Sequence, residues 1–550
     1  MKGFLPTLAL ASAVLSGCVD PGAGVEPPLN RIYFPVGLAI SPGATRLYVA
    51  NSDFDLQFNA GSLQAMDLQR IRELLPKYCT GDSECDTSER CDLTASDANG
   101  GIPSHWCVAR EGERAGKPCG ALSEKSLASR VIAPGRCSYV DPQNPPGGGK
   151  SLVVGSVGIG AFATDVLYRA RPTGPGGRLF IPVRGDSTLH YIDVKNDTDE
   201  SGVPFELECG QGGNDGRCDD QHRRGDDPEE ENTRGLRLAA EPFGIAATDD
   251  GEAIVLTHQT EGIASLFVND AEAWGDGVTN FGVGPKLEFA VGGLPARPIG
   301  VAALPEPGIV KEKNLAYQPG FLVTFRDSAE VRLLRYYSDQ ASQPPRPFLQ
   351  QAGAVAITAN SLGYDSRGIA IDSSKRAACE AGCPLGGDAR ETCLNDCAAV
   401  PAGVYIANRT PATLLVGETR PNASATSSDD LPHFKTSVPI SFGPSRVVVA
   451  NVIDKNGTLA PRVFVVCFDS RSIFVFTPEG QYESKIETGR GPHAFAVDSG
   501  GEGTDIRALG FVGHFTDSYI GVIDLDQRHK STYGTILMTL GRPVAPRASK

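Results

Sequence analysis

Seven imperfect copies of one strand–turn–strand unit run along this chain, and this repetition restricts its fold more than any other feature. Each copy opens with a short apolar strand and turns into a second β-rich strand that ends in polar residues. A Ser/Thr-rich turn then leads to a third, β-branched strand. The openings are PVGLAI (35–40), GAFATDV (160–166), PFGIAAT (242–248), PIGVAAL (298–304), SRGIAID (366–372), PSRVVVA (444–450) and PHAFAVD (492–498).

A single unit of this kind cannot bury both faces of its sheet, so neighbouring units must stack. Each copy has three clear strands, and an outer fourth strand fits before the next copy begins. Four-stranded sheets repeated around an axis form a β-propeller, in which closure of the ring protects the ends. The sequence therefore predicts an all-β, seven-bladed β-propeller over residues 31–546. An array of two-sheet sandwiches is the alternative.

The second and third strands carry a pattern of their own, clearest in RLYVANSD (46–53) and RLFIPVRGDSTLHYIDV (178–194). Together with the openings, it approximates P-x-G-I-A-V, then L-Y-V-T-N, then S-V-x-V-I-D. On these motifs the chain resembles the YVTN-type seven-bladed β-propeller family over most of residues 31–541, which implies the same fold. The stretch GTILMTLGRPVAP (534–546) is expected to complete the last blade.

The N-terminus has the pattern of a bacterial lipoprotein. Residues 1–17 form a signal peptide in which an apolar stretch is too short to span a membrane. The motif LSGC at residues 15–18 resembles the lipobox, in which the cysteine is acylated. We expect Cys18 to carry the lipid, palmitate included, and residues 18–30 to form a tether. Because no Asp directly follows Cys18, the outer membrane is the expected location. An ordinary secretion signal is the alternative.

Charge limits the partners of the exported body. The formal net charge is -15, which disfavours nucleic acids and anionic membrane surfaces. No later stretch is long and apolar enough to span a bilayer. We therefore expect other envelope proteins as partners, membrane contact through the lipid anchor, and no required cofactor.

Fourteen cysteines in an exported chain favour disulfides over metal thiolates. Apart from Cys18 and Cys467, which lies in an apolar strand, they fall in three insertions. These are a cysteine-rich segment of blade 1 (69–150), an acidic segment of blade 2 (195–235) and a segment of blade 5 (373–402). The first insertion holds six cysteines whose pairing stays open: Cys79, Cys85, Cys91, Cys107, Cys119 and Cys137.

The other two insertions allow specific pairings. Cys209 and Cys218 of the second insertion are expected to close a single loop. In the third, two Cys-x3-Cys pairs each lie one helical turn apart. This spacing predicts a helical hairpin stapled by Cys379–Cys397 and Cys383–Cys393, with zinc binding as the alternative. From the register of the repeat, all three insertions are expected on the bottom face. This is the face where the turns between strands one and two, and three and four, open.

One acidic stretch fits a calcium loop. Asp197, Asp199, Ser201 and Glu208 match the spacing D-x-[DN]-x-S-G-x5-E, which supplies oxygen ligands at alternate positions. No flanking helices are evident, so an acidic surface loop is the alternative. The run PPGGGKS (145–151) lacks the first glycine of a phosphate-binding loop and is not a phosphate site.

Candidate binding residues lie on the top face, where the turns between strands two and three open. The residues after each opening position are expected to rim the central channel: Val36, Phe162, Phe243, Ile299, Arg367, Ser445 and His493. The ends of the second strands give a second set: Asn51, Arg184, His258, Arg326, Arg409 and His514. Arginines here would form a local anion-binding rim. Solvated turn residues paired with neighbouring Asp side chains are the alternative.

These patterns favour a non-catalytic binding or scaffold lipoprotein of the bacterial envelope, with its ligand or partner on the top face. The channel rim is mostly apolar and lacks the convergent carboxylates and histidines of an acid–base centre. The alternative is a propeller enzyme of lactonase or lyase type with its site at the top of the channel. For that alternative, His493, Arg367 and His514 are the residues to test.

Overall fold

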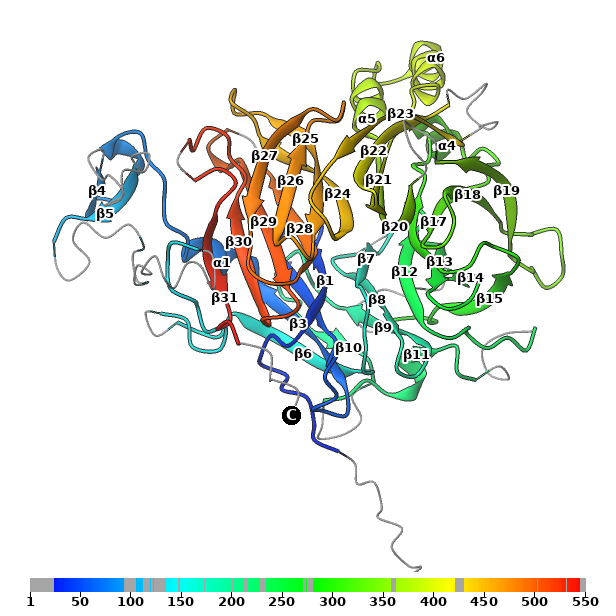
Figure 1. Ribbon diagram of the computed structural model, residues 1–550, viewed down its shortest axis with the longest axis horizontal. Helices are drawn as coiled ribbons and strands as arrows, with labels where there is room; N and C mark the ends of the chain where they lie inside the picture. Colours follow the sequence, from blue (N-terminus) through cyan, green and yellow to red (C-terminus); the bar gives the residue numbers. More distant parts are fainter. Residues whose placement is uncertain are drawn as a thin grey trace, which may run out of the picture.

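Seven antiparallel sheets surround a central channel in a computed structural model of the chain (Figure 1). The structure describes residues 24–544 except 93–104, 112–118, 120–121, 123–134, 147–148, 173, 200, 211–215, 228–233, 271–273, 275–279, 358–362, 421–429, 502 and 531. The seven-bladed β-propeller predicted from the repeat is confirmed. The predicted lipid-bearing Cys18 lies outside the described residues. No helix among the described residues has the length and apolarity needed to cross a membrane.

Each blade is built from strands of one continuous stretch of the chain, and the first strand lies nearest the channel. Blade 1 contains β1 (Pro35–Ile40), β2 (Arg46–Asn51), β3 (Gly61–Asp67) and β6 (Val153–Ile159). Blade 2 contains β7 (Leu167–Ala170), β8 (Gly177–Val183), β9 (Thr188–Val194), β10 (Leu207–Glu208) and β11 (Arg223–Arg224). Blade 3 contains β12 (Pro242–Ala247), β13 (Ala253–His258), β14 (Ala264–Val268) and β15 (Lys286–Val291).

The remaining blades follow the same order. Blade 4 contains β16 (Pro298–Ala303), β17 (Gly320–Phe325), β18 (Glu330–Tyr337) and β19 (Phe348–Ala356). Blade 5 contains β20 (Tyr364–Asp372), β21 (Gly403–Thr410), β22 (Ala412–Thr419) and β23 (Pro432–Pro439). Blade 6 contains β24 (Pro444–Ile453), β25 (Leu459–Cys467), β26 (Ser472–Phe476) and β27 (Tyr482–Glu487). Blade 7 contains β28 (Pro492–Gly500), β29 (Arg507–His514), β30 (Tyr519–Asp524) and β31 (Ile536–Leu540).

The repeated glycine at the start of most blades lets the innermost strands approach closely. A Cβ atom added to Gly37 would lie 2.5 Å from the backbone nitrogen of Val166 in the next blade. At Gly368 the same atom would lie 2.7 Å from the nitrogen of Val447. Because seven inner strands must fit around one narrow axis, a side chain at these positions would push neighbouring blades apart. The motif therefore reflects packing around the channel.

Blade 2 departs from the predicted pattern at both ends. The expected opening strand at 160–166 is wrong as a strand, because β7 begins only at Leu167. Phe162 adopts a left-handed backbone conformation with φ 60°, as Phe34 and Asp365 do just before the openings of their blades. Blade 2 therefore opens at Ala163, which forms a bridge with Val183. At the other edge, β10 and β11 both pair with β9, so the predicted insertion 195–235 itself supplies the outer edge of this blade.

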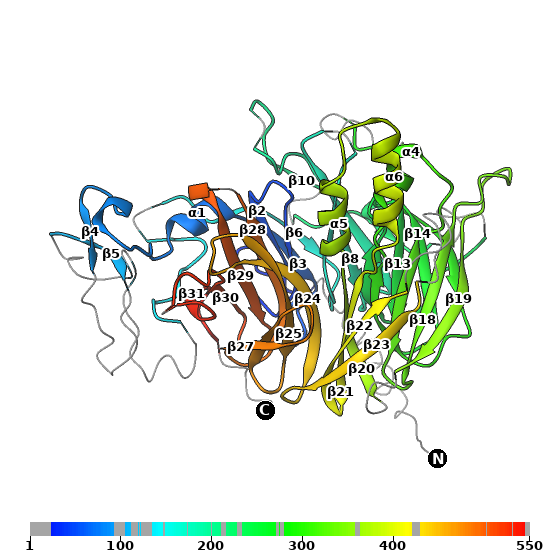
Figure 2. The ribbon, with the colours of Figure 1, turned by 90° about the horizontal axis from the view of Figure 1, so that it is seen from above.

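The insertions contribute the short helices and a small hairpin. Residues 69–150 lie between β3 and β6 and carry η1 (Asp82–Glu84), β4 (Glu89–Asp92) and β5 (Trp106–Ala109), with α1 (Leu68–Glu73) at their start. The segment 373–402 carries α5 (Ser374–Ala381) and α6 (Gly387–Ala398). These pack with α4 (Gly308–Lys313), and the three helices gather at the same end of the disc (Figure 2). Two further 3-10 helices are η2 (Asp220–His222) and η4 (Gly503–Asp505).

Six disulfides join the cysteines of the insertions. In the helical hairpin, Cys379 is bonded to Cys397 and Cys383 to Cys393, and the blade 2 loop is closed by Cys209–Cys218. The first insertion, whose pairing was open, contains the bonds Cys79–Cys91, Cys85–Cys107 and Cys119–Cys137. Cys467 is a buried free thiol on β25.

The ring closes between blades 7 and 1 without a shared sheet. Strand β1 packs against β28, and a cluster of buried side chains from both blades fills the joint. The blade 1 insertion then reaches back across it. Val140 donates its N–H to Thr539 on β31 (2.8 Å), and Gly541 donates to the Val140 carbonyl (2.8 Å). The insertion therefore clasps the outer strand of the last blade, and Cys119–Cys137 holds this clasp in place.

We expect loss of the Cys119–Cys137 bond to lower the stability of the whole propeller. A bond that closes a loop of this size is worth about 3 kcal/mol. The double variant Cys119→Ser/Cys137→Ser should therefore lower the main calorimetric unfolding transition. The matched control, Cys383→Ser/Cys393→Ser, removes a bond from the peripheral helical hairpin and should leave that transition in place. Equal shifts in both variants would contradict a special role of the clasp in ring closure.

Candidate functional site

The mouth of the channel contains two adjoining cavities lined by the first strands of the blades. One has a volume of about 150 Å³ and the other about 220 Å³. Phe243 and His493 line both. Together the cavities include every residue of the first predicted rim set: Val36, Phe162, Phe243, Ile299, Arg367, Ser445 and His493.

The smaller cavity has an aromatic wall. Phe54 from the β2–β3 turn, which is 51% exposed, contacts Phe162 and Phe515 edge to face at ring separations of 5.9 and 5.1 Å. Phe468 continues the wall, 6.3 Å from Phe515. Such edge-to-face contacts favour a preformed apolar surface. This cavity can therefore accept an apolar or aromatic group.

The larger cavity is charged, and its arginines come from blades 5 and 6. Arg446 forms an ion pair with Asp165 of blade 2 on the other side of the channel. Arg367 forms an ion pair with Asp365, which also accepts a bond from Arg326 at 3.2 Å. Two guanidinium groups thus share one carboxylate, which leaves one excess positive charge beside the channel. The excess favours an anionic group on any ligand held there.

His493 separates the two cavities. Its ring lies 6.4 Å from Phe468 and 6.5 Å from Phe515, both edge to face. Burial lowers the pKa of His493 to about 3, and Arg446 and Arg367 add to this shift by repelling a protonated ring. His493 is therefore neutral at physiological pH and offers one hydrogen-bond donor and one acceptor to the cavity.

The two other histidines predicted at the rim do not reach it. His258 is fully buried, where its ring contacts the carbonyl of Ala240 (3.1 Å) and the hydroxyl of Ser265 (2.8 Å). His514 is also fully buried, accepts the N–H of Gly489 (3.0 Å) and stacks on Tyr519. Both are structural residues that satisfy polar groups between the strands. Their assignment to a binding rim was wrong.

A one-residue register error in the second predicted set explains this result. Asn51, His258 and His514 each pair directly with the opening proline of their blade, at Pro35, Pro242 and Pro492. Arg184, Arg326 and Arg409 lie one position later in this register, so Arg184 and Arg326 directly follow the ends of β8 and β17. Because successive strand residues point to opposite faces, the first group points into the blade and the second lies at its end.

Each arginine of the second set has an acidic neighbour. Arg184 pairs with Glu241 at 2.9 Å, and Arg409 pairs with Asp469 at 2.5 Å. Arg326 pairs with Asp365, as described above. The alternative interpretation paired these arginines with neighbouring Asp residues in the sequence. In the structure they pair instead with a carboxylate of the next blade, Asp365 or Asp469, or of the connection that leads to it, Glu241. Arg184 also lines the aromatic cavity, whereas Arg409 lines neither cavity.

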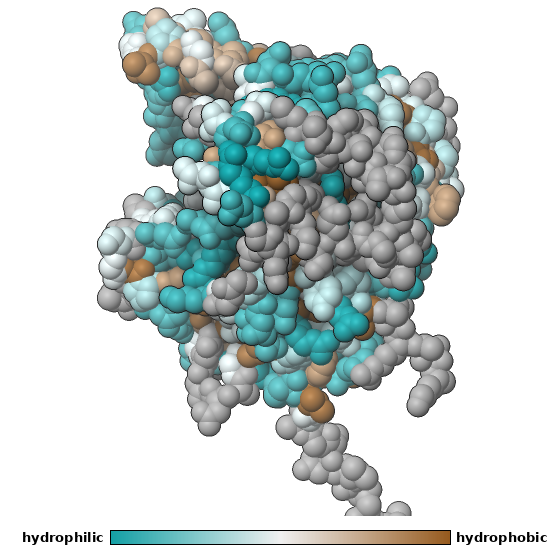
Figure 3. Space-filling view, turned by 90° about the vertical axis from the view of Figure 1, so that its left-hand side faces the viewer, coloured by the Kyte–Doolittle hydropathy of each residue, from teal (hydrophilic) through white to brown (hydrophobic). Residues whose placement is uncertain are grey.

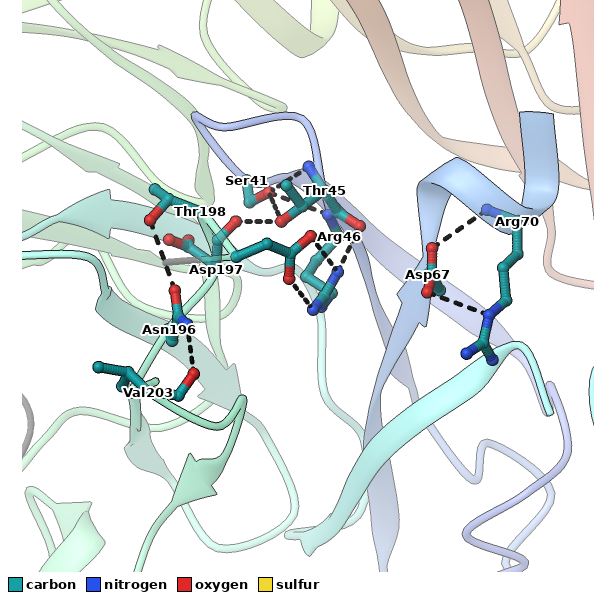
Figure 4. Close-up of polar contacts among 10 residues, drawn as sticks. Ser41, Thr45, Arg46, Asp67, Arg70, Asn196, Asp197, Thr198 and Val203 are labelled. Carbon is teal, nitrogen blue, oxygen red and sulfur yellow. Dashed lines mark hydrogen bonds and ion pairs between the residues drawn. The ribbon is translucent and has the colours of Figure 1, made fainter. Parts of the chain in front are cut away.

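The predicted calcium loop has a different arrangement. Asp199 forms an ion pair with Arg46 (2.5 Å), and the carbonyl of Asp197 accepts the hydroxyl of Thr45 from blade 1 (Figure 4). Glu208 lies on β10 and accepts the N–H of Gly210 (2.7 Å), while Ser201 is exposed. Within the described part of the chain, these residues join no cluster of three ligand atoms within 4.8 Å. The loop joins blade 2 to blade 1 through the contacts of Asp199 with Arg46 and of Asp197 with Thr45.

Several site residues were missed in the sequence. Phe468 and Phe515 directly follow the second strands of blades 6 and 7, in the same register as Arg326, so a consistent alignment would have found them. Asp165 and Arg446 each lie two positions after the opening residue of their blade, Ala163 or Pro444, where most other blades have the motif glycine. Their pairing across the channel follows only from closure of the ring.

A larger hollow of about 840 Å³ lies off the channel axis, at the joint between blades 7 and 1. The N-terminal segment forms one wall through Tyr33 and Phe34, and Arg542 and Val544 form part of another. Tyr33 there donates its hydroxyl to Asp55 at 2.6 Å. This hollow is lined by mixed polar and apolar loops and adjoins the top face.

Comparisons with known proteins give only distant structural likenesses. No protein-family model matches the sequence, and no curated protein matches it. A protein of Bacteroides uniformis proposed to be a 6-phosphogluconolactonase has a similar structure, with 13% identity, a TM-score of 0.41, and 83% of this chain and 86% of that chain covered. A Bacteroides fragilis protein proposed to have the same activity gives 10% identity, a TM-score of 0.41, and coverage of 84% and 86%.

We expect the imidazoles of His493, His258 and His514 to stay neutral well below the usual histidine range. Burial lowers their pKa values to about 3, 4 and 3. Since the unfolded state takes up these protons at about pH 6.5, stability from these groups is present above that pH and is lost on acidification. Histidine-selective NMR should therefore show neutral rings for all three at pH 5. Titration of His493 near pH 6.5 would contradict the buried cavity.

We expect the acidic loop of blade 2 to be insensitive to calcium. Burial raises the pKa of Asp197 to about 6. Its charged carboxylate therefore lowers the free energy of unfolding at pH 7, and this loss disappears as the folded protein binds a proton there below about pH 6. Asp197→Asn should raise the midpoint of urea unfolding at pH 7 and have little effect at pH 4. Calcium or a chelator should change neither midpoint. A calcium-dependent increase that is lost in Asp199→Ala would restore the metal-loop hypothesis.

Proposed function

We propose that this chain is a lipid-anchored, non-catalytic binding protein of the bacterial envelope, and that it holds a small amphiphilic anion at the mouth of its channel. The observation that carries the proposal is the adjacency of two cavities of opposite character. One is walled by Phe54, Phe162 and Phe515, and the other contains Arg367 and Arg446. An apolar ring with an anionic substituent would satisfy both.

The state of the ionisable groups favours binding over catalysis. Among the described residues, the carboxylates at the channel, Asp165 and Asp365, are each engaged by arginine. A lactonase or lyase would need a group free to take and return a proton. His493 is the one candidate in the cavities, and it has aromatic and cationic neighbours with no carboxylate contact to orient it. The lactonase or lyase function remains the alternative that a turnover assay addresses.

The envelope location rests on the N-terminal sequence. LSGC at residues 15–18 supports acylation of Cys18, and two or more acyl chains anchor a protein stably, whereas one does not. Six disulfides agree with an oxidising compartment outside the cytoplasm. The outer membrane is the proposed location. The disulfide-stapled modules on the opposite face are proposed contacts for other envelope proteins.

We expect an aromatic anion to bind the channel mouth more tightly than its uncharged analogue. The probes are 8-anilinonaphthalene-1-sulfonate and N-phenyl-1-naphthylamine, both followed by fluorescence. Arg367→Gln removes a guanidinium beside the cavity and should weaken sulfonate binding about tenfold, since a charge-assisted hydrogen bond is worth about 1.5–3 kcal/mol. Binding of the uncharged probe should change little.

The matched control is Arg409→Gln, which removes an arginine of the same face that lines neither cavity. It should leave the affinity for both probes unchanged. Equal weakening in both variants would contradict the proposed site. Hydrolysis of simple lactones by the purified protein, abolished in His493→Ala, would favour the enzyme instead.

A further inference from the structure

We infer that the top face of the propeller, with the mouth of its channel, is the face turned toward the membrane and in contact with lipid. This inference rests on the lipid anchor of the proposed function and adds an orientation to it. Three observations carry it: the place where the chain leaves the body, the short tether beyond that place, and the distribution of exposed apolar side chains.

The described chain leaves the body at the top face of blade 1. The carbonyl of Val25 accepts the N–H of Asn59, which lies in the turn between β2 and β3 (2.9 Å). Glu26 accepts a bond from the side chain of the same Asn59 (2.8 Å) and pairs with Arg217 at 3.5 Å. Turns between second and third strands open on the top face. The N-terminal segment is therefore fastened to that face, and its fastening point is defined by side-chain contacts.

The tether beyond this point is short. Gly24 lies six positions after Cys18 in the sequence, and six extended residue steps span about 20 Å at most. A strand such as β19 (Phe348–Ala356) is nine residues long, or about 30 Å. A lipid on Cys18 therefore cannot reach past the disc to its bottom face. The bilayer must lie against the top face or against the adjoining outer edge of blade 1.

The exposed apolar side chains decide between these two surfaces. More than half of the large hydrophobic side chains that stay exposed in the described residues lie in top-face loops or at their margins. They are Val25, Phe54, Leu56, Tyr364, Phe442 and Val544. Phe442 is 68% exposed in the connection between blades 5 and 6, and Leu56 is 61% exposed beside the fastening point.

Among the described residues, the other surfaces of the disc expose fewer large apolar side chains. On the side that carries the β4–β5 hairpin, the described surface is mostly hydrophilic, with apolar residues in small separate patches (Figure 3). The bottom face carries α5 and α6, and its exposed large apolar side chains in the described residues are Val283, Leu315, Leu385 and Tyr482, each from a different loop or strand end. Apolar side chains gain most by leaving water where several of them reach one interface. The occupant of the top face is accordingly the bilayer to which the anchor attaches.

With this orientation, the ligand of the channel mouth comes from the membrane. The aromatic cavity opens beside Phe54, which is itself one of the exposed top-face residues. With this face against lipid, an amphiphile enters the channel mouth from the membrane with its apolar part in the aromatic cavity. Its anionic group then meets Arg367 and Arg446 in the charged cavity beyond.

Single tryptophans can test which face contacts lipid. The two native tryptophans, Trp106 and Trp274, are each 1% exposed and provide a constant background. The test variant is Phe442→Trp on the top face. The matched control is Tyr482→Trp, an aromatic exchange at a 60% exposed position at the opposite end of the same blade. Leu385→Trp marks the helical hairpin.

The lipidated full-length variants are reconstituted in phosphatidylcholine vesicles that contain dibrominated phosphatidylcholine, a short-range quencher of tryptophan. We expect Phe442→Trp to lose most of its added fluorescence and both controls to keep theirs. Quenching of Tyr482→Trp or Leu385→Trp to the same extent, or absence of quenching in all three, would overturn the orientation.

Palmitate labelling of the same preparations separates the two hypotheses. Label that is lost in Cys18→Ser supports the anchor, and absence of label from the unaltered chain overturns the anchor and the orientation together. A labelled protein that floats with the vesicles but leaves Phe442→Trp unquenched overturns the orientation alone.

Discussion

Closure of the ring is the constraint on which the rest of this structure depends. Every blade is made of strands from one continuous stretch of the chain, so no sheet is shared between the first blade and the last. The joint has to be held by packing and by segments that cross it. Arg72 of α1 crosses it to Asp498 on β28 (2.7 Å), and the clasp at Val140 pairs with β31. Without these contacts, the two blade faces at the joint would be open to water.

The insertions therefore have a structural role at the joints between blades. The clasp of blade 1 on blade 7 has a counterpart at the joint between blades 1 and 2. Gly158 on β6 donates to the carbonyl of Gly216 (2.9 Å) and accepts from Cys218 (3.0 Å), so the blade 2 insertion pairs with the outer strand of blade 1. In both cases a disulfide, Cys119–Cys137 or Cys209–Cys218, fixes the segment that crosses the joint. A segment with little core of its own gains its order from such a bond and from its neighbour blade.

The fold could be predicted from the sequence because stacking imposes the same apolar strand seven times. The site could be predicted in part. The first rim set lines the cavities because each residue lies next to a fixed structural landmark, the opening of its blade. The second set mixed residues that pair with the opening of their blade and residues one position later. A shift of one residue in a strand exchanges a buried face for an exposed one. Asn51, His258 and His514 are buried for this reason.

The remaining part of the site depends on substitutions at one position of the repeat. Phe162 has the left-handed conformation that also precedes the openings of other blades, as at Phe34 and Asp365. Blade 2 therefore opens at Ala163, and Asp165 stands where most blades have the motif glycine. Arg446 occupies the same position in blade 6, on the other side of the ring, and forms an ion pair with Asp165. A glycine at either position would leave the other charged side chain without this partner. These two substituted copies thus determine the charge balance at the channel mouth, and their pairing follows only from closure of the ring.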